Sequence, residues 1–536
     1  GTLMPSQTAK GSGGGVGSQT FEIGTPGPGS KTRASGSPGS LTQYFLSTVG
    51  AQTAFNPASG PPIDRNIAQR GQMNLALTAA SSPKLQLQSR AKFPVIYGSG
   101  TFRLLFSNVY LPNSAGPAYT INKVSVEQAG VSTPVTFGGL RTRSVASGEV
   151  FESDTITGTL VPGVAWVRVD ATVTVSGFAT SKLYNTTQLE TGGTIDQSII
   201  FDPINFIDQI DNTGSLTVPT GGTATQMLTA TIIIGNITSD KRAWLGGCTS
   251  IEDGKIDQGS SDGANGGGYL RRAAFKKVVP YASFALTGMA YSQIGATTKP
   301  AFVALCKYHS DLLLGGPTND VFAGSALTVV KTTMGYFWGA KTLAGSTITR
   351  IIQGDLFPRV DTTDHCTSFA GQTNDLTGYA AAGVADQWNT FIATAAGTNN
   401  IDAVWQVRSF FASTTDNHFW GSPGDSAYSF FQTTLAASAL STATTISLAA
   451  LPPATNMGLI LNPGGAQMAP VTGSTLEGIV PYQYTGTGPY TATMFVTIAV
   501  AQNSGNAVVS PFSADGTHPS GFTGNDTAAT IVVAAV

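Results

Sequence analysis

The chain carries little charge. Only 11% of its 536 residues are charged, and 28 Lys and Arg residues against 30 Asp and Glu residues give a formal net charge of -2. Phosphate recognition needs clustered basic surface, so this balance argues against a nucleic-acid-binding protein. Hydrophobic residues make up 41% of the chain, which excludes a disordered polyelectrolyte.

Cysteine and histidine are scarce as well. The three cysteines, Cys248, Cys306 and Cys366, are too few for a disulfide scaffold, and their odd number leaves at least one thiol unpaired within the chain. Neither their spacing nor that of the four histidines matches a metal-binding pattern. We therefore expect no metal and no other cofactor.

Long apolar runs are absent. No stretch of about 18 apolar residues occurs, so we expect no transmembrane helix. The opening residues, Gly-Thr-Leu-Met-Pro, lack the basic start and apolar centre of a signal peptide, and we expect none. A neutral, polar composition is typical of secreted and virion proteins, so the expected location is extracellular or on a virion surface.

Glycine is abundant, with 64 residues, and part of it concentrates near the N-terminus. Residues 1–40 are mostly Gly, Ser, Pro and Thr, which cannot bury enough apolar surface to offset the entropy of ordering. We expect residues 1–90 to form an N-terminal arm with two short helices, Leu41–Val49 and Ile63–Ala79. Either a partner subunit, in a homo-oligomer or larger assembly, or the chain's own surface would hold this arm.

Residues 91–237 alternate in the manner of strands. β-branched and aromatic runs such as Phe102–Tyr110 and Gly163–Val175 are separated by turns that contain Gly and Asn. No helical stretch lies between these runs. The segment therefore predicts an accessory β-sandwich domain.

From residue 238 short apolar strands alternate with helical stretches. This order predicts an α/β domain with a parallel sheet and helices on both faces. We expect helices at 267–278, 299–308, 325–339 and 386–396. An all-β insertion over 431–509 interrupts this domain, so its two parts are 238–430 and 510–536. Ligands bind at the carboxyl ends of the strands in such sheets.

Three polar turns follow apolar segments in this domain. Ser250 lies in a tight turn before a helix, where its N–H can face a developing oxyanion. Asn319 and Asp320 form the second turn, and Asp515-Gly-Thr-His518 the third, in which the Asp can orient an imidazole that takes a proton from a serine. Each turn alone has a simpler interpretation, as a helix cap, an Asx turn and a surface turn. Their order along one domain favours catalysis.

These turns resemble the conserved blocks of the SGNH/GDSL hydrolase family. That family has Gly-Asp-Ser-Ile-x-x-Gly after the first strand, a Gly after the second, then Gly-x-Asn-Asp and a terminal Asp-x-x-His. The matching residues here are Ser250-Ile-Glu-Asp-Gly254, Gly288, Asn319-Asp320 and Asp515-Gly-Thr-His518. The resemblance covers residues 92–430 and 510–536.

The resemblance implies a three-layer parallel-sheet fold and ester hydrolysis through an acyl-serine. Ser250 would be the nucleophile, His518 its general base, and Asp515 the residue that orients the base. The N–H groups of Ser250 and Gly288 and the side-chain amide of Asn319 would form the oxyanion hole.

The sequence departs from the family at two points. Cys248 and Thr249 replace the Gly-Asp before the serine, and Pro317 stands in the third block, so the backbone around the oxyanion hole is altered. Trp405 and Trp420 would suit a sugar-binding cleft, but buried core aromatics are the simpler interpretation.

Two functions follow from these observations. The first is a serine esterase that removes acyl groups, expected to be acetyl, from a polysaccharide or other glycan. The alternative is a structural or host-attachment component of a virion or surface assembly, with an SGNH-like fold that does not catalyse. The four residues Ser250, Asn319, Asp515 and His518 favour the esterase. The arm, the altered turn and an insertion similar to small β modules of phage structural proteins favour the alternative.

Overall fold

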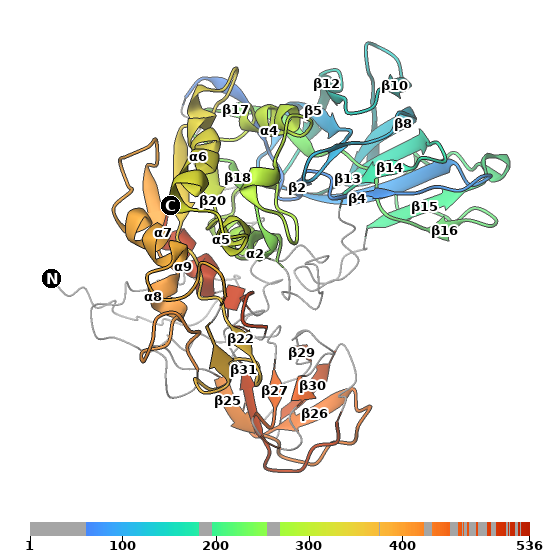
Figure 1. The fold of residues 1–536 in the computed structure, drawn as a ribbon. Coiled ribbons are helices and arrows are strands. Elements are labelled where there is room, and N and C mark those ends of the chain that lie inside the picture. Colours follow the sequence, from blue (N-terminus) through green and yellow to red (C-terminus); the bar gives the residue numbers. More distant parts are fainter. Residues whose placement is uncertain are drawn as a thin grey trace, which may run out of the picture.

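The computed structural model holds a β-sandwich, an α/β domain and a small β region (Figure 1). The predicted helix Leu41–Val49 and the glycine-rich arm lie outside the residues that the structure describes. These residues are 60–181, 196–254, 268–374, 376–422, 431–450, 459–463, 465, 469–470, 479–480, 490–494, 500–510, 513, 515–519, 524–525 and 527–536.

The sandwich consists of two antiparallel sheets. The first has the order β1 (Pro62–Asn66), β17 (Ile232–Thr238), β5 (Ser99–Ser107) and β11 (Val150–Glu152), with β12 (Ile156–Leu160) also on β5. The second has the order β10 (Arg143–Val145), β8 (Tyr119–Gln128), β13 (Gly163–Thr172), β4 (Gln86–Val95), β15 (Gln197–Phe201) and β16 (Thr223–Ala224), with β9 (Val131–Val135) on β8. Alternate residues of the strands, such as Val167 and Val169, are buried between the sheets. The predicted sandwich strands are thereby confirmed.

The predicted helix Ile63–Ala79 is wrong, because this segment forms strands. β1 pairs antiparallel with β17 of the sandwich, β2 (Gly71–Gln72) pairs parallel with β19 of the α/β domain, and β3 (Ala76–Thr78) pairs with β14 (Phe178–Thr180). All three partners come from distant parts of the sequence. A short apolar pattern cannot distinguish helix from strand, and these long-range pairings decided the outcome.

The α/β domain contains a six-stranded sheet whose neighbouring strands all pair parallel, as the sequence predicted. Its order is β2, β19 (Tyr281–Ser283), β18 (Trp244–Gly247), β20 (Asp311–Leu314), β21 (Arg350–Gly354) and β24 (Ala403–Trp405). The expected helices are present as α3 (Tyr269–Lys277), α4 (Lys299–Cys306), α6 (Leu327–Trp338) and α7 (Val384–Ala393). Shorter helices are α2 (Ser250–Asp253), α5 (Thr318–Phe322) and α8 (Arg408–Phe411), and the chain ends with α9 (Thr527–Ala535).

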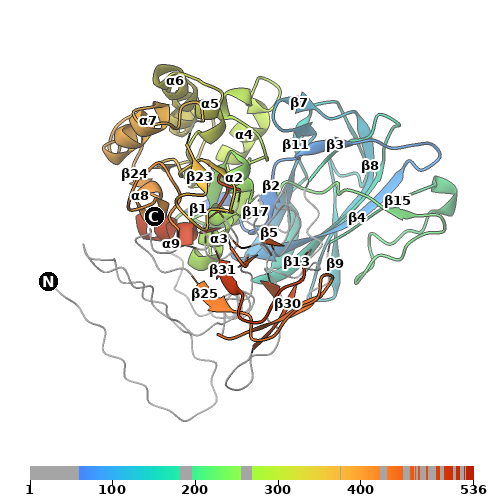
Figure 2. The same cartoon turned by 60° about the horizontal axis from the view of Figure 1, so that its bottom comes forward.

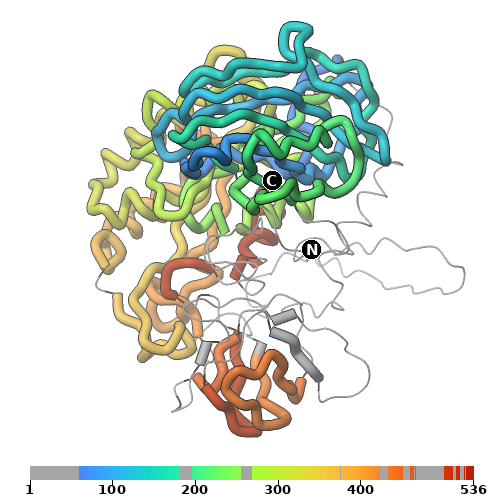
Figure 3. The backbone as a smooth tube through the Cα atoms, turned by 90° about the vertical axis from the view of Figure 1, so that its right-hand side faces the viewer, coloured from blue at the N-terminus to red at the C-terminus, as the bar shows by residue number. Residues whose placement is uncertain are grey.

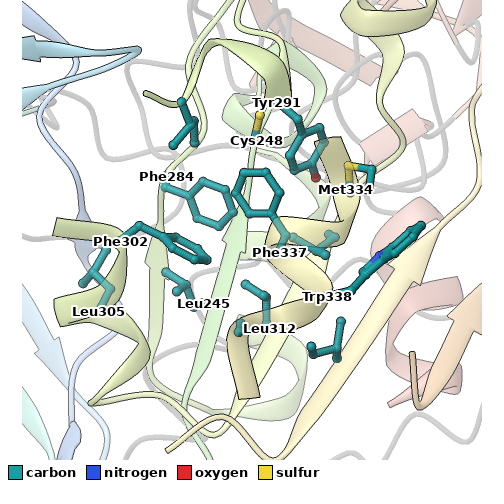
Figure 4. Close-up of a cluster of buried hydrophobic side chains, with 14 of the residues drawn as sticks. Leu245, Cys248, Phe284, Tyr291, Phe302, Leu305, Leu312, Met334, Phe337 and Trp338 are labelled. Atoms are coloured by element: carbon teal, nitrogen blue, oxygen red, sulfur yellow. The ribbon is translucent and has the colours of Figure 1, made fainter. Parts of the chain in front are cut away.

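Apolar side chains cover both faces of this sheet. On one face Leu245 and Leu312 pack against Phe284, Phe302 and Phe337, which come from the loop after β19 and from α4 and α6 (Figure 4). On the other face the core includes residues of α3 and α9. The C-terminal helix therefore packs into the α/β domain, although the β insertion separates it in sequence from the rest of that domain. Burial on both faces explains why the strands are nearly continuous apolar runs.

The described part of 431–510 is β structure, as expected for the insertion. β25 (Phe431–Thr434), β31 (Ala507–Ser510), β27 (Ile460–Leu461) and β28 (Ala469–Pro470) form one antiparallel sheet, and β26 (Thr445–Leu448), β30 (Tyr490–Met494) and β29 (Ile479–Val480) form another. These sheets lie at one end of the molecule (Figures 2 and 3).

The remaining short elements lie in connections. They are β6 (Val109–Tyr110), β7 (Ser114–Ala115), β22 (Asp361–Thr362), β23 (Gln372–Thr373), η2 (Pro203–Asn205), η3 (Tyr291–Gln293) and η4 (Gly339–Thr342). Among the helices of the described residues, none is long and apolar enough to cross a membrane.

Candidate active site

Ser250 lies directly after a central strand of the parallel sheet. β18 ends at Gly247, and α2 begins at Ser250 with Thr249 as its N-cap. The Thr249 hydroxyl accepts a hydrogen bond from the N–H of Ile251, and its backbone N–H donates to the carboxylate of Glu252. This capping box fixes the start of the helix. The Thr that replaces the family's Asp therefore serves as a cap.

Glycine is required at the end of β18. A Cβ atom on Gly247 would lie 2.5 Å from the ring of Phe284. The backbone that leads to Ser250 can therefore pass the aromatic core only without a side chain at this position. The turn before the nucleophile is built on close packing.

The structure brings Ser250, His518 and Asp515 together in one hydrogen-bonded chain. The Ser250 Oγ lies 2.7 Å from the His518 Nε2, and the His518 Nδ1 lies 2.6 Å from the Asp515 Oδ2. Ser250 and His518 are 268 positions apart in sequence, and both are buried, with 4% and 6% of their surfaces exposed. This order of hydroxyl, imidazole and carboxylate can move a proton from the serine to the histidine.

The Asp515 carboxylate is held by its own turn. Its Oδ1 accepts hydrogen bonds from the backbone N–H groups of Thr517, at 2.9 Å, and His518, at 2.8 Å. Burial opposes the charge on Asp515, but the adjacent His518 and these hydrogen bonds outweigh burial and lower the pKa of the carboxyl to about 2. Asp515 is therefore ionised across the pH range in which proteins are normally assayed.

The Asp515–His518 turn is fixed by residues far away in sequence. The carbonyl oxygen of Gly516 accepts hydrogen bonds from the N–H of Val360, at 2.9 Å, and from the indole Nε1 of Trp420, at 2.8 Å. Gly516 has a φ of 76°, and a Cβ atom there would lie 2.1 Å from the Val360 oxygen. Trp420 is completely buried, and Trp405 has only 1% of its surface exposed. Both tryptophans are thus core residues, the simpler of the two interpretations.

The three predicted oxyanion-hole residues lie on loops that follow neighbouring strands. Ser250 starts α2, where the first N–H groups of a helix lack intrahelical partners. Gly288 follows β19 with a φ of 82°, and its neighbour Thr287 donates from N–H and hydroxyl to Asp253 of α2. The loop with Gly288 is thereby tied to the helix that begins at Ser250.

Asn319 lies on α5, after β20, and its amide is oriented from both sides. Its Nδ2 donates to the Met289 carbonyl oxygen at 2.8 Å, next to Gly288, and its Oδ1 accepts from the Arg359 Nη1 at 3.5 Å. The Met289 bond uses one of the two amide N–H groups. One further N–H of the amide remains beyond this bond.

Asp320, the neighbour of Asn319, has a structural role. Its carboxylate oxygens accept hydrogen bonds from the N–H of Tyr291, at 2.8 Å, and from that of Ser292, at 3.0 Å. The Tyr291 hydroxyl in turn donates to the carbonyl oxygens of Gly247 and Gly315, at the ends of β18 and β20. Asp320 thus connects the Asn319 helix with the strand end before Ser250.

Sequence reasoning missed Glu252, a buried carboxyl in the helix that begins at Ser250. The Thr249 N–H and hydroxyl donate to it at 2.8 and 2.7 Å, and the Tyr269 hydroxyl donates to it at 3.0 Å. Burial nevertheless raises the pKa of Glu252 to about 7. Burial likewise raises the pKa of the nearby Cys248 thiol well above its usual value, so Cys248 is a packing residue without nucleophilic character.

Glu252→Gln is expected to change how stability depends on pH. An unfolded Glu has a pKa of about 4.3, so the folded protein retains a proton here that the unfolded chain releases as pH rises. The contribution of this group to stability is complete below about pH 4.3 and is lost as pH rises through about 7. Across this window the Tm of the variant should therefore rise relative to that of the wild type. Thermal denaturation at a series of pH values measures the difference; a difference that stays constant would contradict the prediction.

Within the described ranges, no group of three or more His, Cys, Asp or Glu side chains is placed to hold a metal ion. The titratable groups around Ser250 are instead engaged with one another or with backbone N–H groups.

No protein-family model matches the chain, and no curated protein sequence matches it. Solved structures that match include a protein from Bacillus subtilis, at 13% identity with a TM-score of 0.20; the match covers 52% of this chain and 60% of that one, less than two thirds of its length. A family two carbohydrate esterase from Clostridium thermocellum in complex with cellohexaose matches at 11% identity, over 53% and 78% of the two chains, with a TM-score of 0.20. A salicylyl-acyltransferase from a tetracycline biosynthetic pathway matches at 12% identity, over 61% and 70%, with a TM-score of 0.21. The chain is similar to these proteins only at this distant level.

Proposed function

We propose that the protein is a serine ester hydrolase that acts through an acyl-serine intermediate. The observation that carries this proposal is the hydrogen-bonded chain from Ser250 through His518 to Asp515. These three hydrogen-bonded residues lie at the carboxyl end of a parallel sheet, where α/β folds place their ligands. Its members come from both ends of the α/β domain, which makes a chance surface contact a poor explanation.

The geometry supports the following sequence of steps. His518 Nε2 takes the proton from Ser250 Oγ as this oxygen attacks the ester carbonyl carbon, and the second N–H of Asn319 and the N–H groups of Ser250 and Gly288 stabilise the oxyanion. The imidazolium then gives its proton to the leaving alkoxide, which departs as the alcohol. Water then attacks the acyl-serine as His518 takes its proton. The imidazolium returns this proton to Ser250 Oγ as the bond to the acyl carbon breaks, and the carboxylic acid is released.

For the substrate we propose an acetyl ester on a polysaccharide or other glycan, met outside the cell or at a virion surface. The low charge of the chain supports a polar, largely uncharged surface, which suits a glycan better than a nucleic acid. A role as a homo-oligomer or assembly component held by the N-terminal arm belongs to the same proposal. The altered turn at Cys248 and Thr249 is compatible with activity, since Thr249 caps the helix and Ser250 still meets His518.

The test is covalent labelling of the full chain with a fluorophosphonate, followed by peptide mapping. The expected result is one modified peptide, which contains Ser250, together with acetate release from acetylated sugars and from 4-nitrophenyl acetate. A protein that is not labelled and releases no acetate from either class of ester would instead favour a structural or attachment role.

A further inference from the structure

An arginine with unused binding capacity lies beside the triad. Arg359 reaches Asn319 with its Nη1, and the next residue, Val360, donates its backbone N–H to Gly516 inside the catalytic turn. Arg359 is therefore adjacent to both halves of the site, the oxyanion-hole residue Asn319 and the Asp515–His518 turn. Its side chain is partly exposed.

Arg359 lacks a carboxylate partner, unlike most arginines of the described residues. Arg70 pairs with Asp196 at 2.7 Å, Arg90 with Glu127 at 3.0 Å and Arg408 with Asp386 at 2.8 Å, and six further arginines of the described residues also contact a carboxylate. Among these residues no Asp or Glu oxygen lies within ion-pair distance of Arg359. Its charge is therefore not compensated by a carboxylate of the described residues.

The guanidinium of Arg359 is held in place by aromatic rings. Its central carbon lies 3.7 Å from the ring centroid of Phe322 and 5.9 Å from that of Tyr379. Its Nε is buried without a hydrogen-bond partner, and its contact with the Asn319 oxygen, at 3.5 Å, is long. Stacking fixes the plane of the group and leaves hydrogen-bond capacity at its edge. Phe322 is itself 40% exposed.

We propose that Arg359 binds a carboxylate on the sugar that carries the ester, so that the preferred substrate is an acylated acidic sugar. This inference rests on the proposed ester hydrolysis. An ester whose carbonyl oxygen lies at the Asn319 amide places neighbouring substituents of its sugar near Arg359. An acetyl group has no charge, so the anionic group must belong to the alcohol part of the ester. A planar guanidinium matches a carboxylate in a two-point hydrogen bond, and Phe322 offers an apolar face for the sugar ring.

The experiment compares acetylated sugars that differ only in charge. Mono-acetylated methyl glycosides of galacturonic acid and glucuronic acid are each tested beside their neutral counterparts, galactose and glucose, with acetate release as the readout. The wild type should favour the acidic esters by about 10–100-fold in kcat/KM, mainly through KM, the range expected for a hydrogen-bonded pair of charges. Arg359→Gln should bring the ratio of acidic to neutral kcat/KM close to one, and Arg359→Lys should restore part of it.

Two further variants separate recognition from other effects. Lys341→Gln removes one positive charge next to Asp402, at the amino end of β24, whereas the site lies at the carboxyl ends of the strands; this variant should leave the ratio unchanged. Asn319→Ala should lower kcat on both classes of ester alike, by about 10²–10³-fold. If Arg359→Gln shows the Asn319→Ala pattern, or if the wild type has no preference, the recognition role is wrong while ester hydrolysis stands. If no ester is hydrolysed and Ser250 is not labelled, both proposals fail.

Discussion

Ser250→Ala is expected to lower kcat for ester hydrolysis by at least about 10⁴-fold, because no other side chain can replace the attacking oxygen. In the structure the Ser250 Oγ is the atom that bonds to His518 Nε2, and the neighbouring thiol, Cys248, is fully buried with its pKa raised. Fluorophosphonate labelling should disappear in the same variant. KM should change little if the hydroxyl takes no part in binding the ground state. Steady-state kinetics with 4-nitrophenyl acetate and with an acetylated sugar measure both constants.

Ser198→Ala is the matched control for this variant. Ser198 lies on β15 of the sandwich, is 5% exposed, and donates its hydroxyl to the Gln226 carbonyl oxygen at 2.8 Å. The Ser198→Ala variant loses a similarly buried hydroxyl in the sandwich, outside the triad, and it should keep wild-type kcat. Activity retained in Ser250→Ala, with the fold intact by circular dichroism, would exclude Ser250 as the nucleophile.

Asp515→Asn is expected to lower kcat by about 10⁴-fold, close to the loss seen when a triad aspartate is made neutral. The Asp515 carboxylate accepts a hydrogen bond from His518 Nδ1–H and thereby keeps Nε2 unprotonated, ready to accept the serine proton. An asparagine can turn its amide N–H toward Nδ1 and so favour the opposite tautomer, in which Nε2 carries the proton. KM and the fold should be preserved. The loss should therefore fall on kcat across the whole accessible pH range.

Stability at low pH gives a second readout for Asp515. The pKa of this carboxyl is about 2 in the folded protein and about 3.9 in an unfolded chain, so its contribution to stability is present above pH 3.9 and is lost as pH falls through about 2. Asp515→Asn should remove this part of the acid transition. Asp416→Asn provides the control, since Asp416 also bonds to a histidine Nδ1, that of His418, but lies outside the triad. An equal loss of kcat in both variants would argue against a specific role for Asp515.

Much of the site could be predicted from the sequence because its parts lie in local motifs. The serine after a glycine turn, the Asn-Asp pair and the Asp-Gly-Thr-His turn each occupy a few consecutive residues, and their order matches that of a parallel α/β domain. The strand and helix alternation after residue 238 is equally local. Patterns of this kind depend on neighbours in the chain, so they can be read without knowing the fold.

What the sequence did not reveal depends on contacts between distant segments. The strands at 62–78 form only because β17, β19 and β14 offer edges to them. Trp420 could not be assigned to the catalytic turn, which lies 96 positions away. Glu252 lies in the capping-box pattern that begins at Thr249, but its raised pKa arises from burial in the folded protein. The position of Arg359 over the Phe322 ring likewise depends on tertiary packing. Charge environment is a property of the packed molecule.

The segment from β1 to β3 also determines how the protein can be divided. Within seventeen residues it adds a strand to the sandwich, an edge strand to the parallel sheet, and a partner to β14. A fragment that begins at residue 238 would lose the strand that covers one edge of the catalytic sheet and would expose its backbone groups for pairing with other chains. The accessory sandwich is therefore not a removable module. Because this segment is shared, we expect the two domains to unfold together rather than one at a time.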